Sequence, residues 1–262
     1  MIIFSAFTPH SPLLLPSIGK SKIKNVAKTT EALKHLHEEL YASHPDVLVI
    51  ISSHGDQHEN AFSINLHDSY HAQVKEFGDL ETSKEFLPEY QLIDQIQRHV
   101  RSKDIPLTLD SHDHLDHGSS VPLLLLTERL DNLHILPISY SDLSGKDHIE
   151  FGRALKDVLV NSKKRIALIA TGDLSHCLST DAPAGFKKEG EIFDKAIQEV
   201  LKDMTTSKLL SLDPDLIEEA SQCAYRPLLI LFGILERMNT RTEILSYEAP
   251  FGVGYLTAQF HL

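Results

Sequence analysis

The pattern of hydrophobic and polar positions along the chain predicts strands and helices in alternation. Short apolar runs rich in β-branched residues are typical of buried strands, and they occur at 2–7, 46–52, 61–66, 133–140 and 165–171. Amphipathic or apolar helical patterns occur between and after them, at 22–41, 89–102, 121–130 and 148–160. This alternation predicts a largely parallel or mixed sheet with helices on both faces. No linker or internal repeat divides the chain, so we expect a single α/β domain over 1–262.

The C-terminal third continues the pattern with more helix. Phe193, Ala196, Ile197, Val200 and Leu201 share one helical face. A second helix is expected from 213 to 220, because Asp213 is a good N-cap and Pro214 suits the first helical position. A mostly buried helix is predicted at 225–238, and two β segments around a Pro/Gly turn at 243–260.

Composition and charge exclude several classes of protein. The formal net charge of −12 argues against a nucleic-acid partner or an acidic membrane surface, since both require a basic face. No apolar run approaches the roughly 20 residues that span a bilayer, and the first residues suggest a strand and loop instead of a signal peptide. The two cysteines, Cys177 and Cys223, do not form a disulfide framework, so a cytoplasmic location is expected. Cys177 is expected to be a buried thiol.

Histidine is unusually frequent, with sixteen residues in the chain. Ligands of open α/β sheets bind beyond the carboxyl ends of strands, and His10, His54 and His176 each follow a predicted strand. His117 precedes a predicted helix with Ser120 as a plausible N-cap, and a helix N-terminus would favour its neutral form. These four histidines are therefore the candidates for chemistry.

The other histidines are expected to play lesser parts. A group on charged helical stretches is predicted to be solvated, and it comprises His35, His37, His99 and His148. In SHDHLDHGSS (111–120), His112 and His114 are expected to line the approach to a pocket, with Asp113 and Asp116 orienting their neighbours.

A carboxylate would complete a metal site, and Glu248 lies between a predicted strand and a Pro/Gly turn. Two neutral histidines and one carboxylate hold non-haem Fe(II) in many oxygenases and leave coordination positions open. The proposed ligands lie far apart in the sequence, so their spacing alone does not define the site.

Five segments together resemble the class III extradiol ring-cleavage dioxygenases, the LigB-type catalytic subunit. They are TPHSPLLLP (8–16), SSHG (52–55), LDHGSSVPL (115–123), TGDLSH (171–176) and SYEAPFGVGYL (246–256). Within that superfamily the chain looks closest to the uncharacterised Memo-associated branch.

The resemblance implies a role for each matching residue. His10, His54 and Glu248 would hold Fe(II), His176 would act as acid and base on the substrate, and His117 would be a catalytic residue that contacts the substrate. The implied function is extradiol cleavage of a catechol-type aromatic substrate by O2. Ring-cleaving enzymes often carry glycine at the position of Asp173, which puts an additional acidic group near the base.

Two alternatives to the dioxygenase follow from the same residues. The first is a Memo-like protein that binds metal or peptide without oxygenase activity. The second is a zinc hydrolase that activates water with the same ligands, because two histidines and a glutamate suit Zn as well as iron. The partners expected are a small aromatic substrate, O2 and a second copy of the chain in a homo-oligomer.

Overall fold

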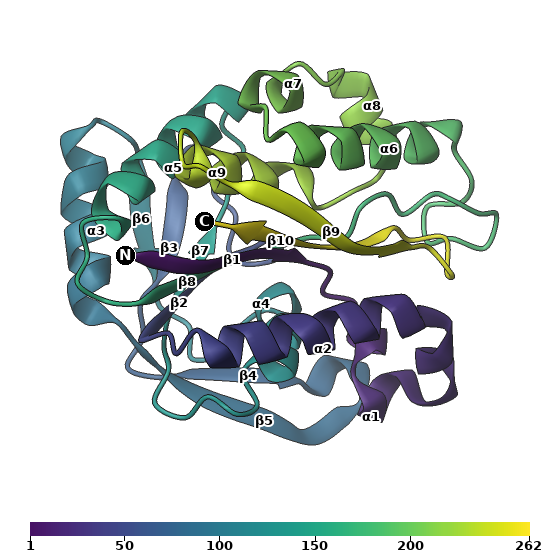
Figure 1. Ribbon diagram of the computed structural model, residues 1–262, viewed down its shortest axis with the longest axis horizontal. Coiled ribbons are helices and arrows are strands. Elements are labelled where there is room, and N and C mark those ends of the chain that lie inside the picture. The colour runs from purple at the N-terminus through teal and green to yellow at the C-terminus, as the bar shows by residue number, and fades with distance from the viewer.

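The computed structural model describes residues 1–262, and its strands form one mixed sheet (Figure 1). The strands are β1 (Ile2–Thr8), β2 (Val47–Ser52), β3 (Phe62–Asn65), β4 (Tyr70–Val74), β5 (Asp79–Pro88), β6 (Leu107–Asp110), β7 (His134–Ser139), β8 (Ile166–Thr171), β9 (Arg241–Glu248) and β10 (Tyr255–His261). The main path through the sheet is β4-β5-β7-β2-β8-β1-β10-β9, while β3 pairs with β6 and β7.

The centre of the sheet is parallel and fully buried. β1 pairs in parallel with β8, β8 with β2, and β2 with β7. Every residue of β2 and β8 is buried, as expected for strands covered on both faces. The antiparallel strands β10 and β9 extend one side, and the β4–β5 hairpin lies at the other. Because β1, β8 and β2 run in the same direction, the loops that follow them emerge at one edge of the sheet.

Helices cover both faces of this sheet (Figure 1). The longer ones are α2 (Ala27–Ala42), α3 (Tyr90–Ser102), α4 (His117–Leu126), α5 (Gly145–Leu159), α6 (Lys188–Asp203) and α9 (Tyr225–Leu235). One core joins α3, α5, α6 and α9 to the side chains of Val47, Val49 and Ile51. The other joins α2 and α4 to Leu48 and Ile50. Successive side chains of β2 thus point alternately into the core on one face of the sheet and the core on the other.

Short helices complete the chain. They are η1 (Pro12–Leu14), α1 (Pro16–Gly19), η2 (Lys20–Val26), η3 (Lys75–Phe77), α7 (Thr206–Leu210) and α8 (Pro214–Glu219). Asp213 caps α8 through the backbone N–H of Asp215, as its sequence predicts. The single α/β fold with a mixed sheet and helices on both faces is confirmed. No helix is both long and apolar enough to cross a membrane.

Three local expectations differ from the structure. The predicted helix at 22–41 begins as the 3-10 helix η2 and becomes α-helical only at Ala27. Ser120 is not an N-cap, because α4 already begins at His117, and Pro122 lies inside the helix. The β4–β5 hairpin was not expected. Its strand β5 is largely exposed and polar, so it lacks the apolar pattern that marks the central strands.

Candidate metal centre

Three of the candidate histidines meet at the carboxyl edge of the sheet. His10 follows β1 and His54 follows β2, and their Nε2 atoms lie 3.0 Å apart. The ring of His117, the first residue of α4, stacks on that of His54 with centroids 4.2 Å apart. Its centroid is 5.4 Å from that of His10. The parallel order of the strands therefore brings together side chains that the sequence separates widely.

A cysteine joins this group. Cys223, directly before α9, places its Sγ 3.7 Å from the Nε2 of His10, and the ligand atoms of His10, His54 and Cys223 all lie within 4.8 Å of one another. Two nitrogens bound to one tetrahedral ion would be about 3.3 Å apart, and a nitrogen and a sulfur about 3.6 Å. The separations of His54 and Cys223 from His10 are close to these values, so the three side chains could hold one transition-metal ion through two imidazoles and a thiolate.

The Asp116-His117-Gly118 sequence explains how His117 reaches the centre. Asp116 caps α4 by accepting a hydrogen bond from the backbone N–H of Ser119, and it also accepts from the hydroxyl of Ser52. The helix must approach the end of β2 closely, since a Cβ on Gly118 would lie 2.6 Å from the Ser52 Oγ. Glycine and a capping aspartate thus fix His117 against His54.

The position of Cys223 is fixed by the loop that follows β8. The backbone N–H of Cys223 donates to the carbonyl of Asp173, and the N–H of Asp173 donates to the Cys223 Sγ at 3.2 Å. A Cβ on Gly172 would lie 2.5 Å from the Cα of Ala224, so glycine is needed there for the two loops to meet. The TGDLSH segment therefore both carries His176 and holds the thiol in place.

Burial sets the protonation states of the group. It lowers the pKa of His10 well below its usual value, with the neighbouring histidines adding to the effect. Desolvation, and to a smaller extent the neighbouring His117, lowers the pKa of His54 to about 4, although His54 as a whole is an exposed residue. The imidazoles are thus neutral and able to donate lone pairs to a metal. Burial also raises the pKa of Cys223 to about 12, so the thiol needs a cation nearby to ionise.

A cavity of about 430 Å³ opens onto the histidines. His10, His54, His117 and His176 line it, together with Asp173. Burial lowers the pKa of His176, and its Nδ1 is buried without a hydrogen-bond partner. Burial raises the pKa of Asp173 to about 7. The cavity therefore offers neutral imidazoles and an easily protonated carboxyl group next to the candidate ligands.

The two loops that frame this cavity come from distant parts of the chain. Asp181 and Pro183, in the loop after His176, lie at its wall. Tyr255 also lines it and donates from its hydroxyl to the Ser11 Oγ. The loop after His176 thus contributes to the wall of the cavity.

Glu248 lies apart from the candidate ligands. Its Oε1 accepts hydrogen bonds of 2.7 Å from both the backbone N–H and the hydroxyl of Thr29, in the first turn of α2. The group whose ligand atoms lie close together includes Cys223 and not Glu248. The carboxylate expected at the third position is therefore engaged elsewhere, at the N-terminus of a helix where negative charge is favourable.

Among the remaining histidines, two that were expected in solvent are buried. His37 and His148 are buried, not solvated, and their Nδ1 atoms contact the carbonyls of Leu126 and Ser144. The side chains of His112 and His114 are more than half exposed, and they line a separate cavity of about 350 Å³ that also touches His54. Cys177 is a buried thiol as expected.

Sequence reasoning missed Cys223. It lies in SQCAYRP (221–227), a polar stretch directly before an apolar helix. Pro227 within the first helical turn marks a helix N-terminus, where polar residues often face a site. That signal is weak, because nothing in it pairs the cysteine with histidines more than 160 residues away.

Comparisons with known proteins agree with this fold. Residues 5–258 match the family model described as the catalytic LigB subunit of aromatic ring-opening dioxygenase, and the chain belongs to this family. The chain is 30% identical over 256 residues to Protein CA_C1420 of Clostridium acetobutylicum, covering 94% of the chain and 55% of that protein.

A second relative carries an enzyme name. It is the 2,3-dihydroxyphenylpropionate/2,3-dihydroxicinnamic acid 1,2-dioxygenase of Photorhabdus laumondii, 26% identical over 179 residues, which cover 64% of the chain and 54% of that protein. The chain thus spans about half the length of these curated relatives. The crystal structure of the uncharacterized protein JW3007 from Escherichia coli K12 has the same fold, with a TM-score of 0.70 and 18% identity over 99% of this chain and 100% of that one.

Proposed function

We propose that this protein is an Fe(II)-dependent dioxygenase that opens the ring of a catechol-type aromatic substrate, with the metal held by His10, His54 and Cys223. The observation that carries the proposal is the convergence of two neutral imidazoles and a thiol, with Nε2 to Nε2 at 3.0 Å and Nε2 to Sγ at 3.7 Å. Membership in the ring-opening dioxygenase family supports the reaction class. Cys223 takes the position for which the sequence suggested Glu248.

The surrounding residues have the properties that such a reaction needs. A bound Fe(II) would supply a Lewis acid that lowers the pKa of a substrate hydroxyl and a centre at which the diol and O2 are brought together. His176 lines the cavity with a neutral imidazole, so it can accept the hydroxyl proton and return it later. His117 also lines the cavity, and its ring lies against that of the candidate ligand His54. It can therefore donate or accept a hydrogen bond at the oxygens of a substrate bound beside the metal.

The test is turnover by reconstituted protein. The full chain is loaded with Fe(II) without oxygen, and oxygen uptake is then followed with a panel of catechols that includes 2,3-dihydroxyphenylpropionate. We expect ring-opened product from wild type, a loss of at least about 100-fold in His176→Ala, and no loss in the control His99→Ala, on the partly exposed face of α3. Full iron occupancy with no oxygen uptake on any catechol would refute the oxygenase proposal.

A second candidate function, metal binding without ring cleavage, is favoured by one specific observation. A thiol stands at the third position, and thiolates favour softer metals such as Cu(I) and Zn, whereas carboxylates suit harder ions. The same donors could also hold Zn for hydrolysis. Protein that binds Cu(I) or Zn stoichiometrically, takes up no oxygen with any catechol when loaded with Fe(II), and hydrolyses none of a panel of esters would support the binding role over both enzymes.

A further inference from the structure

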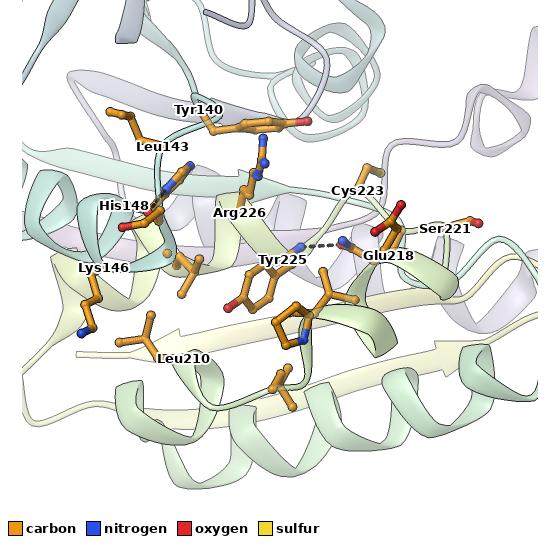
Figure 2. A pocket seen from close by; sticks show the side chains of 17 residues that line it. Tyr140, Leu143, Lys146, His148, Leu210, Glu218, Ser221, Cys223, Tyr225 and Arg226 are labelled. Carbon is orange, nitrogen blue, oxygen red and sulfur yellow. Dashed lines mark hydrogen bonds between the residues drawn. The ribbon is translucent and has the colours of Figure 1, made fainter. Parts of the chain in front are cut away.

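A larger cavity, of about 940 Å³, is lined by Cys223 but by none of His10, His54, His117 and His176 (Figure 2). It is formed by the start of α5, the end of α7, the helix α8 and the start of α9. Its volume is within the usual range for organic ligands. Apolar side chains make up part of its wall, namely Leu210, Leu212, Ile217 and Leu229.

Two cationic side chains of this cavity, Arg226 and Lys146, have hydrogen-bond donors that the protein leaves unused. Arg226 stands beneath the ring of Tyr140, with its guanidinium carbon 5.3 Å from the ring centroid (Figure 2). Only its Nη1 is engaged, with the carbonyl of Ser141 and with the carboxylate of Asp142. The Nε and Nη2 of Arg226 make no hydrogen bond, and these two atoms form the side of the guanidinium that binds a carboxylate with two parallel hydrogen bonds.

Two further side chains of the wall carry polar atoms without a partner in the protein. Lys146 lines the cavity from the exposed first turn of α5 and takes part in no ion pair with the protein, while one carboxylate, Glu218, lies on the opposite side (Figure 2). His148 is fully buried in the wall; its Nδ1 donates to the carbonyl of Ser144, which leaves its Nε2 as a hydrogen-bond acceptor without a partner. A buried imidazole nitrogen without a partner is costly unless a ligand or water meets it.

We propose that this cavity is a second ligand site, and that it binds an amphipathic organic carboxylate. The carboxylate would bind the free side of Arg226 with Lys146 adding attraction, and the hydrocarbon body would cover the apolar wall. The unused edge of the Arg226 guanidinium and the unpaired ammonium of Lys146, in a chain of net charge −12, are what select an anion here. The proposal does not rest on the proposed function, since the two sites share only Cys223.

The test is calorimetric titration of the full chain with octanoate and with 3-phenylpropionate, each compared with its neutral amide. We expect one equivalent of carboxylate to bind, and the amide to bind about tenfold more weakly. The tighter of the two acids identifies an aliphatic or an aromatic ligand body. Equal affinity for acid and amide would overturn the proposal.

Single substitutions test whether Arg226 and Lys146 bind the carboxylate. Arg226→Lys keeps the charge but loses the paired donors, so affinity should fall about tenfold, and Lys146→Met should lower it by about threefold. Lys163→Met, in the exposed loop before β8, is the matched control and should change nothing. Thermal unfolding of each variant establishes that it is folded.

His54→Ala separates this site from the candidate metal centre, because His54 is a candidate ligand that does not line the larger cavity. Carboxylate binding should survive in that variant, since the donors that we assign to the ligand lie elsewhere. Loss of carboxylate binding in His54→Ala, with Arg226→Lys unaffected, would place the ligand on the metal centre and refute a second site.

Discussion

The Sγ of Cys223 lies 3.7 Å from the Nε2 of His10, although 213 residues separate the two in the sequence. The contact depends on hydrogen bonds between Asp173 and Cys223 that join the loop after β8 to the start of α9. Because β8 lies beside β1, the same sheet edge also presents His10. A metal bound at this point would therefore link the first strand, the centre of the sheet and the last long helix.

Replacing Cys223 should weaken metal binding far more than replacing the other cysteine. Cys223→Ser removes the thiolate, and we expect affinity for Zn or Fe(II) to fall by at least about 100-fold, as measured by chelator competition. Cys177→Ser is the matched control, since that buried thiol points to the carbonyl of Ala220 and should leave affinity unchanged. Equal metal affinities for wild type and Cys223→Ser would show that Cys223 is not a ligand.

Metal affinity should rise with pH. The imidazole of His54 is already neutral above its pKa of about 4, whereas the Cys223 thiol, with its pKa raised to about 12, must release a proton when metal binds. Between pH 6 and 8 the apparent affinity should therefore increase by about tenfold per unit. Competition titrations across that range give the slope, and Cys223→Ser should be nearly flat. A flat wild-type profile would contradict thiolate ligation.

Glu248→Ala should affect folding instead of metal binding. Losing the carboxylate leaves the backbone N–H of Thr29 without its partner, so we expect the free energy of unfolding to fall by about 1–2 kcal/mol in denaturant titrations. Metal stoichiometry should stay at the wild-type value. The control is Glu243→Ala, an exposed position on the same strand, where little change is expected. Loss of metal from a folded Glu248→Ala protein would show that Glu248 is a metal ligand after all.

Asp194 should make the protein less stable as pH rises from about 4 to 6. Burial raises its pKa to about 6 from an ordinary 3.8, so between these values the unfolded chain releases a proton that the folded chain keeps. That difference removes stability with rising pH, up to about 3 kcal/mol. Asp194→Asn, which can keep the contacts to Ser175 and Tyr247, should reduce the decline and leave the part due to Asp173, whose pKa is also raised. An unchanged profile in this variant would assign the pH dependence to other groups.

Sequence patterns predicted the central sheet well because it is buried. β2 and β8 are continuous apolar runs. The polar residues that follow β1, β2 and β8 include His10, His54 and His176, respectively. Tertiary packing accounts for what the patterns missed. His148 was expected in solvent, but the face of α5 that carries it packs against Phe62, with ring centroids 5.0 Å apart.

The third ligand position shows more clearly what sequence patterns alone cannot predict. Glu248 has the residue type and the strand-end location of a ligand, yet it binds Thr29 because β9 lies beside α2. Cys223 has no neighbouring ligand in the sequence, and only the close approach that Gly172 permits brings it to His10. Local patterns identify strand ends, whereas the pairing of distant loops depends on the whole fold.

X-ray absorption spectroscopy of the metal-loaded protein tests the central claim most directly. Protein loaded with one equivalent of Zn or Fe(II) should show nitrogen scatterers near about 2.0–2.1 Å and one sulfur scatterer near about 2.3 Å. The sulfur contribution should vanish in Cys223→Ser and persist in Cys177→Ser. A spectrum fitted by nitrogen and oxygen alone in wild-type protein would contradict a metal held by His10, His54 and Cys223.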